Sequence, residues 1–249
     1  MSNCIAPIAT PPWTTLGKKL ESMVRKALHE YQLITSEKKI GIALSGGKDS
    51  LTLLYLLKAI SGRGFEPFEI VCFHVGGEYS CGAKISENFL QNICSQLNVK
   101  LVYLQSSQKL ATLNCYRCSR ERRSLIFEAA KKEEINTIAF GHHRDDSIET
   151  LLLNLFHKGE FAANLPKVPM LDYGVTIIRP LIFLSKEEIK SFASMYGYYR
   201  ITCECPVGQT SKRNDVSAII SQLELQFPNI KNNLALAALE YGSKKALKI

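Results

Sequence analysis

The 249-residue sequence lacks a hydrophobic run long enough to cross a membrane, and it lacks a recognisable secretory signal. Its most apolar stretch, Leu51–Leu57, is far shorter than the roughly 20 residues that a transmembrane helix needs. Met1–Ile5 carries neither a basic segment nor a long apolar one. We therefore expect a cytoplasmic protein that does not contact a membrane. In that reducing compartment the eight cysteines should serve as ligands or reactive thiols rather than as disulfides.

Internal repeats, low-complexity segments and an excess of acidic residues are also missing. The hydrophobic content of 46% and the charged content of 22% are ordinary for a soluble globular protein. Lys and Arg number 31 against 23 Asp and Glu, which gives a formal net charge of +8. This balance favours a polyanionic partner.

A Walker A loop is absent, although a glycine-rich turn, Ser45–Ser50, follows a short apolar stretch. Counted from Gly41 against the pattern G-x-x-x-x-G-K-[ST], Gly47 stands where lysine is required. Asp49 then follows Lys48, where the Mg²⁺-binding hydroxyl would stand. The turn is therefore not the loop that supports transfer of a γ-phosphate.

The turn nevertheless has the features of a phosphate site. Residues 40–44 are apolar and β-branched, which predicts a buried parallel strand, and Leu51–Leu57 predicts a buried helix. The N–H groups at a helix N-terminus attract anions, Gly46 and Gly47 allow close approach, and Lys48 adds a positive charge. We expect a phosphate group to bind here, against the alternative of an ordinary glycine turn. The hexapeptide Ser45–Ser50 resembles the SGGxDS loop of the ATP pyrophosphatase (PP-loop) superfamily, which implies that the phosphates are those of ATP.

The apolar pattern predicts a doubly wound, mainly parallel α/β sheet with helices on both faces, because strands alternate with helices of 10–15 residues. The expected strands are residues 40–44, 68–75, 100–104, 137–140 and 175–178. The expected helices are residues 16–31, 51–60, 85–97, 118–132 and 145–156, and the chain is mainly helical from residue 185. Three prolines in residues 1–13 predict a loose arm.

Three segments are expected. Residues 1–34 form an N-terminal arm and helix, residues 35–183 an ATP-binding α/β domain, and residues 184–249 a helical C-terminal extension that carries the late cysteine. Ligands of doubly wound sheets bind at the carboxyl ends of the strands, and the glycine turn and Gly141 both fall on that edge.

A second motif, Gly141-His142-His143-Arg144-Asp145-Asp146, follows the fourth expected strand. Two adjacent carboxylates can hold Mg²⁺, which prefers oxygen ligands. The alternative is that Asp145 caps the following helix, and both roles can hold at once. For the two histidines a structural or substrate-orienting role is favoured over metal ligation.

The cysteines supply a third motif. Cys115 and Cys118 form C-x-x-C, and Cys203 and Cys205 follow much later in the chain. Four thiolates suit structural zinc, whereas three thiolates with one open iron suit an iron–sulfur cluster that handles substrate. Spacing alone leaves both alternatives open. Cys72 lies in an expected strand and should be a core residue.

Together these motifs resemble the tRNA 2-thiocytidine synthetase family of PP-loop ATP pyrophosphatases, over about residues 16–240. The resemblance is carried by the turn Ser45–Ser50, the C-x-x-C, the Gly141–Asp146 motif, Arg120, Arg122, Arg123 and Ile178-Arg179-Pro180-Leu181. It implies a 4Fe–4S cluster held by Cys115, Cys118 and Cys205. The late cysteines of the family are spaced C-x-x-C, whereas Cys203-x-Cys205 is spaced differently, so Cys203 is the alternative third ligand.

The resemblance also implies a reaction. ATP would bind on Ser45, Gly46, Gly47, Lys48, Asp49 and Ser50 beside Gly141, with Mg²⁺ aided by Asp49 and Asp146. The C2 oxygen of a tRNA pyrimidine, most simply an anticodon-loop cytidine, would attack the α phosphorus. Sulfide from the open iron would then attack C2, with Arg122 offsetting phosphate charge or guiding the RNA. The implied partners are tRNA and a cysteine desulfurase or other sulfur donor.

Other functions stay open at this point. They are a 2-thiouridine-forming tRNA sulfurtransferase, a different PP-loop ligase, and a non-catalytic nucleotide-binding protein with a structural zinc site. The sequence names neither the modified nucleotide nor the sulfur donor, and it leaves the oligomeric state, including a homodimer, open.

Overall fold

The computed structural model describes residues 6–77, 87–107, 115–199 and 212–243. The helices are α1 Thr15–Glu30, α2 Lys48–Ile60, α3 Glu87–Gln96, α4 Cys115–Lys132, α5 Arg144–Lys158, α6 Lys186–Met195, α8 Lys212–Gln226 and α9 Ile230–Tyr241, with a 3₁₀ turn η2 at Leu171–Tyr173. The strands are β1 Lys39–Ala43, β2 Glu69–Gly76, β3 Lys100–Gln105, β4 Thr137–Ala139, β5 Lys167–Met170 and β6 Val175–Ile178.

The strands form one six-stranded sheet in the order β3-β2-β1-β4-β6-β5. All neighbours run parallel except β5, which pairs with β6 antiparallel. The chain turns from β1 to β2 on one side and later returns with β4 on the other side of β1. The doubly wound, mainly parallel fold is confirmed, and its topological switch point lies between β1 and β4, where ligands bind in such sheets.

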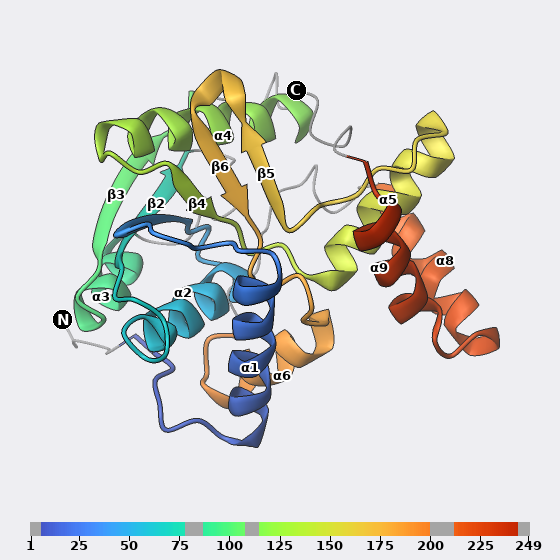
Figure 1. Ribbon diagram of the computed structural model, residues 1–249, viewed down its shortest axis with the longest axis horizontal. Coiled ribbons are helices and arrows are strands. Elements are labelled where there is room, and N and C mark those ends of the chain that lie inside the picture. Colours follow the sequence, from blue (N-terminus) through green and yellow to red (C-terminus); the bar gives the residue numbers. More distant parts are fainter. Residues whose placement is uncertain (1–5, 78–86, 108–114, 200–211, 244–249) are drawn as a thin grey trace.

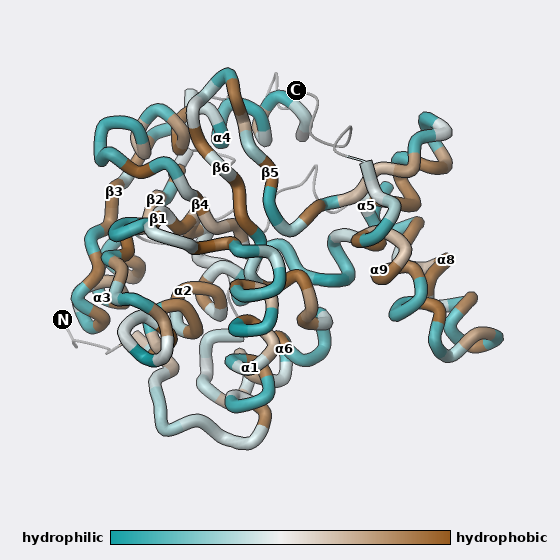
Figure 2. The backbone as a smooth tube through the Cα atoms, viewed as in Figure 1, coloured by the Kyte–Doolittle hydropathy of each residue, from teal (hydrophilic) through white to brown (hydrophobic). Residues whose placement is uncertain are grey.

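Helices cover both faces of the sheet (Figure 1). The larger core joins α1, α2, α3 and α6 to one face, and the smaller core joins α4 to the other face. In Figure 2 brown, apolar stretches run along the strands and along α2, whereas α1 alternates between hydrophilic and hydrophobic residues. Nearly every residue of α2 is buried, so the helix that follows the glycine turn is held firmly by the core.

The expectation of a loose arm is wrong for residues 6–13. Ala6 and Ala9 are buried, and the Tyr55 hydroxyl donates to the Pro7 carbonyl oxygen at 3.0 Å. The Trp13 ring lies edge-on to Phe192 with centroids 5.6 Å apart. Small side chains and prolines let this segment lie flat against the core, so it adds to the packed body. Residues 1–5 lie outside the described residues.

Strand β5 was not among the expected elements. It is short, and Pro169 lies within it, which makes it read as a turn. Because β5 is an edge strand with one paired neighbour, the missing N–H of Pro169 is tolerated there.

Helices α8 and α9 pack on α5 and extend away from the sheet (Figure 1). A small core joins these three helices: Ile148, Leu152, Val216, Ile220 and Ala235. Helix α6, by contrast, packs on α1 and α2. The division of the chain at residues 34 and 183 stays a prediction. Among the described helices none is long and apolar enough to span a bilayer.

Candidate functional site

The predicted phosphate loop connects the end of β1 to the start of α2. Gly46 has a φ of 82°, a conformation that glycine adopts without strain. The Gly46 N–H donates to the Ser50 hydroxyl at 3.2 Å, and the Gly47 N–H donates to the Ser45 hydroxyl at 3.3 Å. The two hydroxyl oxygens lie 3.0 Å apart. The loop is thus closed on itself by its own serines, with the first turn of α2 directly behind it.

Lys48 and Asp49 form an ion pair at the first turn of α2. The Lys48 ammonium lies 2.8 and 2.9 Å from the two oxygens of the Asp49 carboxylate. Both side chains are partly exposed, so each remains accessible to a ligand. The loop therefore presents one cation and one carboxylate beside the backbone N–H groups that favour an anion.

Gly141 brings the end of β4 against this loop. A Cβ at this position would lie 3.0 Å from the Asp49 carbonyl carbon and 3.0 Å from the Ser50 nitrogen. The approach is backbone to backbone, and only glycine permits it without a shift. The carboxyl ends of β1 and β4 therefore meet as the sequence predicted.

The start of α5 adds two more groups to the same place. The N-cap residue is His143, whose N–H donates to the Asp146 carboxylate at 2.9 Å. The His143 Nε2 atom lies 3.4 Å from Asp146 Oδ2 and 3.8 Å from Asp49 Oδ1. The two carboxylates that were predicted to aid Mg²⁺ therefore converge on one histidine. Carboxylate oxygens are the ligands that a hard divalent cation prefers.

Asp145 is not the helix cap, so that alternative is wrong. It lies inside the first turn of α5 and accepts a hydrogen bond from the Lys186 N–H at 2.9 Å. Its role is to join the starts of α5 and α6, since the cap position is already taken by His143.

Asp146 is held in its charged form. Burial alone would raise its pKa, but interactions with His143, His142 and Arg213 outweigh burial and lower it. The Arg213 guanidinium, from the first turn of α8, lies 3.4 Å from Asp146 Oδ1. The structure thus brings Arg213 to the site from a helix that lies far from Asp146 in the sequence.

Sequence reasoning missed a contact between His142 and Arg179. Arg179 is 1% exposed, and its Nε donates to His142 Nδ1 at 3.3 Å. Burial lowers the pKa of Arg179 to about 10, and burial together with the Arg179 charge lowers that of His142 to about 3. The available signal was the Arg-Pro pair directly after β6, at the same sheet edge as the glycine loop.

The C-x-x-C motif begins α4. Cys115 and Cys118 are three residues apart in the first turn, and Cys118 is buried. The positive end of the helix dipole favours thiolates there. This donor pair fits a soft metal centre, whereas Cys203 and Cys205 lie outside the described residues. Within the described residues no group of three metal-ligating side chains gathers.

Arg122 also lies on α4, and its charge contributes to lowering the pKa of His74, although burial of that histidine is the larger cause. His74 is buried at the carboxyl end of β2, and its Nδ1 donates to the Leu44 carbonyl oxygen at 2.7 Å. Since Leu44 directly precedes the glycine loop, His74 links the carboxyl end of β2 to that loop.

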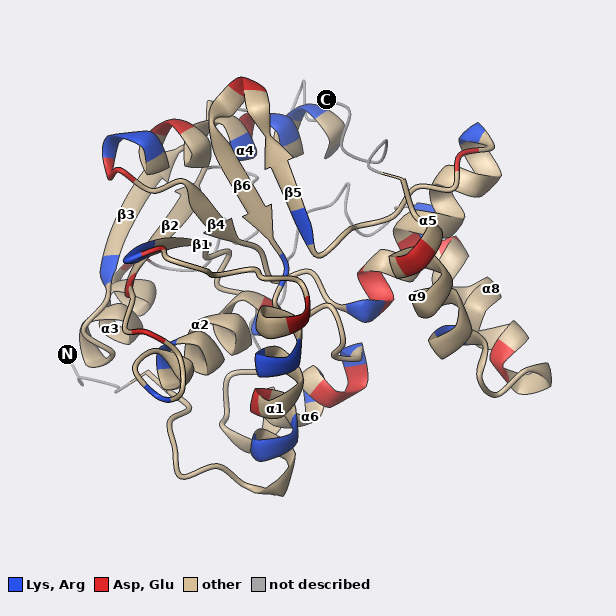
Figure 3. Ribbon diagram, in the orientation of Figure 1, with Lys and Arg blue, Asp and Glu red and all other residues tan. Residues whose placement is uncertain are grey.

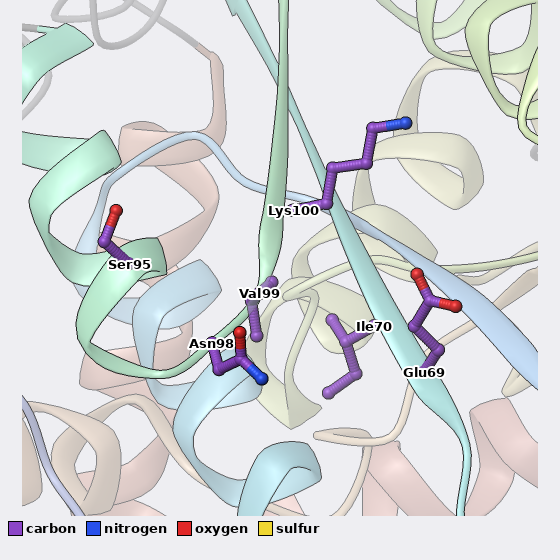
Figure 4. A pocket seen from close by; sticks show the side chains of 6 residues that line it. All are labelled: Glu69, Ile70, Ser95, Asn98, Val99 and Lys100. Carbon is purple, nitrogen blue, oxygen red and sulfur yellow. The ribbon is translucent and has the colours of Figure 1, made fainter.

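A pocket lies at the opposite end of the strands (Figure 4). It is lined by Glu69, Ile70, Ser95, Asn98, Val99 and Lys100. These residues stand at the amino ends of β2 and β3 and at the end of α3, away from the loop. Lys100 is paired with Glu133 at 2.7 Å. The pocket is therefore not part of the candidate site.

Comparison with known proteins agrees with this geometry. A model of the PP-loop domain family matches residues 15–221. The tRNA-cytidine(32) 2-sulfurtransferase of Geobacter sulfurreducens is 31% identical over 227 residues, which cover 88% of each chain. The enzyme of the same name from Bartonella tribocorum is 32% identical, over 89% of this chain and 79% of that one.

Among solved structures, the U34-tRNA thiolase NcsA from Methanococcus maripaludis, with its [4Fe-4S] cluster, superimposes with a TM-score of 0.70. It is 22% identical and the match covers 89% of this chain and 77% of that one, which supports the fold. Because the family model spans most of the chain and the relatives cover it at 30% identity or more, the chain belongs to the PP-loop family, in the group that resembles the tRNA-cytidine(32) 2-sulfurtransferases.

Proposed function

We propose that this protein is an ATP-dependent tRNA sulfurtransferase that replaces the C2 oxygen of a pyrimidine, most simply cytidine 32, with sulfur. The observation that carries the proposal is the convergence at the β1–β4 switch point. The glycine loop, Asp49 and Asp146 meet there, and the C-x-x-C helix starts at the same edge of the sheet. The names of the relatives supply the substrate class.

In the first step the pyrimidine C2 oxygen attacks the α phosphorus of ATP. The bond between the α phosphorus and the oxygen that bridges to the β phosphorus breaks, and pyrophosphate leaves. The loop N–H groups and Lys48 bind the departing pyrophosphate. Asp49 and Asp146 would hold Mg²⁺, which neutralises charge on the phosphates when bound.

In the second step a hydrosulfide-level sulfur adds to C2, its proton is released, and the C2–O bond breaks. The oxygen leaves with AMP, so the first step has turned a poor leaving group into a good one. Cys115, Cys118 and Cys205 would hold a 4Fe–4S cluster, which when bound supplies an open iron position for sulfur. Arg122 balances charge on the nucleotide or the RNA backbone. A cysteine desulfurase would supply the sulfur as a persulfide, which a thiol reductant converts to the hydrosulfide level while the thiols are oxidised to a disulfide. A sulfide donor would supply sulfur at that level directly.

Pyrophosphate release in the presence of tRNA tests the proposal, with mass spectrometry of the tRNA nucleosides to identify the product. Lys48→Ala and Asp49→Ala should each lower release about 100-fold or more, because transition-state charge is no longer matched. Lys58→Ala, an exposed lysine in the last turn of the same helix, is the matched control and should behave as wild type. Circular dichroism of all three variants should stay unchanged.

Wild-type turnover in either loop variant would show that the loop has a structural role and not a catalytic one. A 2-thiouridine product would show that the modified nucleotide is a uridine. If no pyrophosphate is released in the presence of tRNA, the proposed activity is wrong.

A further inference from the structure

The His142 ring is held from two strands of the sheet. On one side the Phe140 ring lies parallel to it, with an interplanar angle of 8° and centroids 5.8 Å apart. On the other side Arg179 Nε donates to His142 Nδ1 at 3.3 Å. Arg179 is itself fixed, because its Nη1 donates to the Leu165 carbonyl oxygen at 2.6 Å. The ring therefore has little freedom to turn.

This contact determines which nitrogen of His142 carries the proton. A guanidinium has only donors, so Nδ1 must accept, and the neutral ring then carries its proton on Nε2. Arg179 is buried and keeps its positive charge, which disfavours a second positive charge on the ring. The other charged or titratable groups that act on His142 are Asp146, Arg213 and His143. Asp146 alone among them favours the charged ring, and the balance keeps His142 neutral.

The Nε2–H group is available to a ligand. It has no hydrogen-bond partner within the part of the chain that the structure describes, the ring is partly exposed, and Nε2 is not among the enclosed polar atoms. His142 stands between Gly141, which touches the phosphate loop, and His143, which lies beside Asp49 and Asp146. The donor is therefore placed where the nucleotide is proposed to react.

We propose that His142 donates a hydrogen bond from Nε2 to an oxygen of the reacting α-phosphoryl group, and that buried Arg179 is the positioning residue that fixes this tautomer. The proposal rests on the proposed function. Negative charge grows on these oxygens when the base attacks, and it stays on AMP when AMP leaves. A neutral N–H group stabilises that charge without transferring its proton, as oxyanion-hole donors do.

Amide side chains test which nitrogen matters, because Gln places an N–H near the position of Nε2 and Asn places one near Nδ1. His142→Asn should lower kcat for pyrophosphate release about 100-fold with little change in KM for ATP. His142→Gln should keep kcat within about 10-fold of wild type. His157→Gln, an exposed residue of α5, is the control and should change nothing. Equal kcat for His142→Asn and wild type would overturn the role of Nε2.

A second readout does not depend on activity. In ¹⁵N-histidine-labelled protein, NMR should show one neutral Nε2–H imidazole that does not titrate between pH 5 and 8, and His142→Gln should remove that signal. In Arg179→Met, which keeps the side-chain bulk, the same ring should show both tautomers and should titrate. A ring that is Nδ1–H or charged at pH 7 in wild type would overturn the assignment even if Arg179→Met does not fold. If tRNA-dependent release is absent but the NMR result holds, the proposed function fails and the tautomer assignment stands.

Discussion

Gly141 shows how one missing side chain sets the geometry of the site. In Gly141→Ala the new Cβ would press on the Asp49–Ser50 peptide at 3.0 Å, so the loop must shift by a few tenths of an ångström. We expect ATP affinity to fall about 10-fold or more, and the free energy of unfolding to change by about 1 kcal/mol. Binding calorimetry and urea unfolding measure the two effects.

Gly159→Ala is the control for this variant. Gly159 has a φ of 64°, and nothing lies near its missing Cβ. Alanine there should cost about 1–2 kcal/mol of stability through backbone strain but leave ATP affinity unchanged. An unchanged ATP affinity in Gly141→Ala would show that the loop can shift to accommodate the new Cβ without weakening ATP binding.

The cysteines give a second test at the residue scale. After anaerobic purification, Cys115→Ala, Cys118→Ala and Cys205→Ala should each lose most of the iron, because each removes one of three thiolate ligands. Cys203→Ala should keep it. Metal analysis of each variant decides the matter. One zinc per chain without iron would contradict the proposed 4Fe–4S cluster. Loss of iron in Cys203→Ala but not in Cys205→Ala would make Cys203, rather than Cys205, the third ligand.

Motif residues were predictable from the sequence because they are neighbours in the chain. The loop Ser45–Ser50 and the Gly141–Asp146 motif each lie within six consecutive residues after an apolar strand. The contact of Arg179 with His142 and that of Arg213 with Asp146 were not predictable, since each joins separate elements. The pairing of β6 with β4 and the packing of α8 on α5 create those contacts.

At the scale of elements, periodicity located the strands and helices of the doubly wound sheet to within a few residues. The first helix, α1, is capped by Thr14, whose hydroxyl accepts from the Gly17 N–H at 3.2 Å. Periodicity failed for β5, because a four-residue edge strand with a proline carries too little pattern. It also failed for residues 6–13, because Ala6 and Ala9 are buried and Trp13 packs on Phe192 of α6 without any helical or strand repeat.

Helix α6 offers a test of charge at a helix start. The Ser185 hydroxyl accepts from the Glu188 N–H at 3.2 Å, and the Glu188 carboxylate accepts from the Ser185 N–H at 2.9 Å. Lys19 of α1 lies 2.8 Å from Glu188. Burial alone would raise the pKa of Glu188, but Lys19 and Ser185 outweigh it and lower the pKa. The charged form therefore stabilises the fold above the ordinary glutamate pKa, and this contribution is lost as pH falls through the lowered value.

Glu188→Gln keeps the capping hydrogen bonds but removes the charge. At pH 7 the substitution should lower the free energy of unfolding by about 1 kcal/mol or less, since solvent screens the ion pair between Lys19 and Glu188. The difference from wild type should shrink towards zero as the pH falls below about 4. Urea unfolding at several pH values measures it, with the exposed Glu187→Gln as control. A cost that does not depend on pH would mean that shape, not charge, matters at this position.

At the scale of the whole molecule, the net charge of +8 is unevenly placed. Figure 3 shows basic residues at both ends of α4. Those near its start are Arg117, Arg120, Arg122 and Arg123, and Arg213 of α8 also reaches the site. If this surface binds RNA phosphates, the affinity for tRNA should fall steeply with salt, because each contact releases counterions.

We expect Arg120→Ala combined with Arg123→Ala to reduce the slope of log affinity against log salt by about 1.4–1.8, the value for two phosphate contacts. Lys131→Ala with Lys132→Ala, at the other end of the same helix, is the matched control. ATP binding should persist in both double variants. A slope unchanged by the arginine pair would place the RNA surface elsewhere, for example on the lysines at residues 244–248.

The position of β1 between β2 and β4 also has a consequence during protein synthesis. β2 leaves the ribosome soon after β1, but β4, which covers the other side of β1, comes much later in the chain. At about 5–20 residues per second, on the order of 5–20 s pass between them. During that time the backbone of an apolar strand has one unpaired edge, a template for pairing with other chains. The nascent protein should therefore depend on chaperones most strongly in this interval, before β4 pairs with the free side of β1.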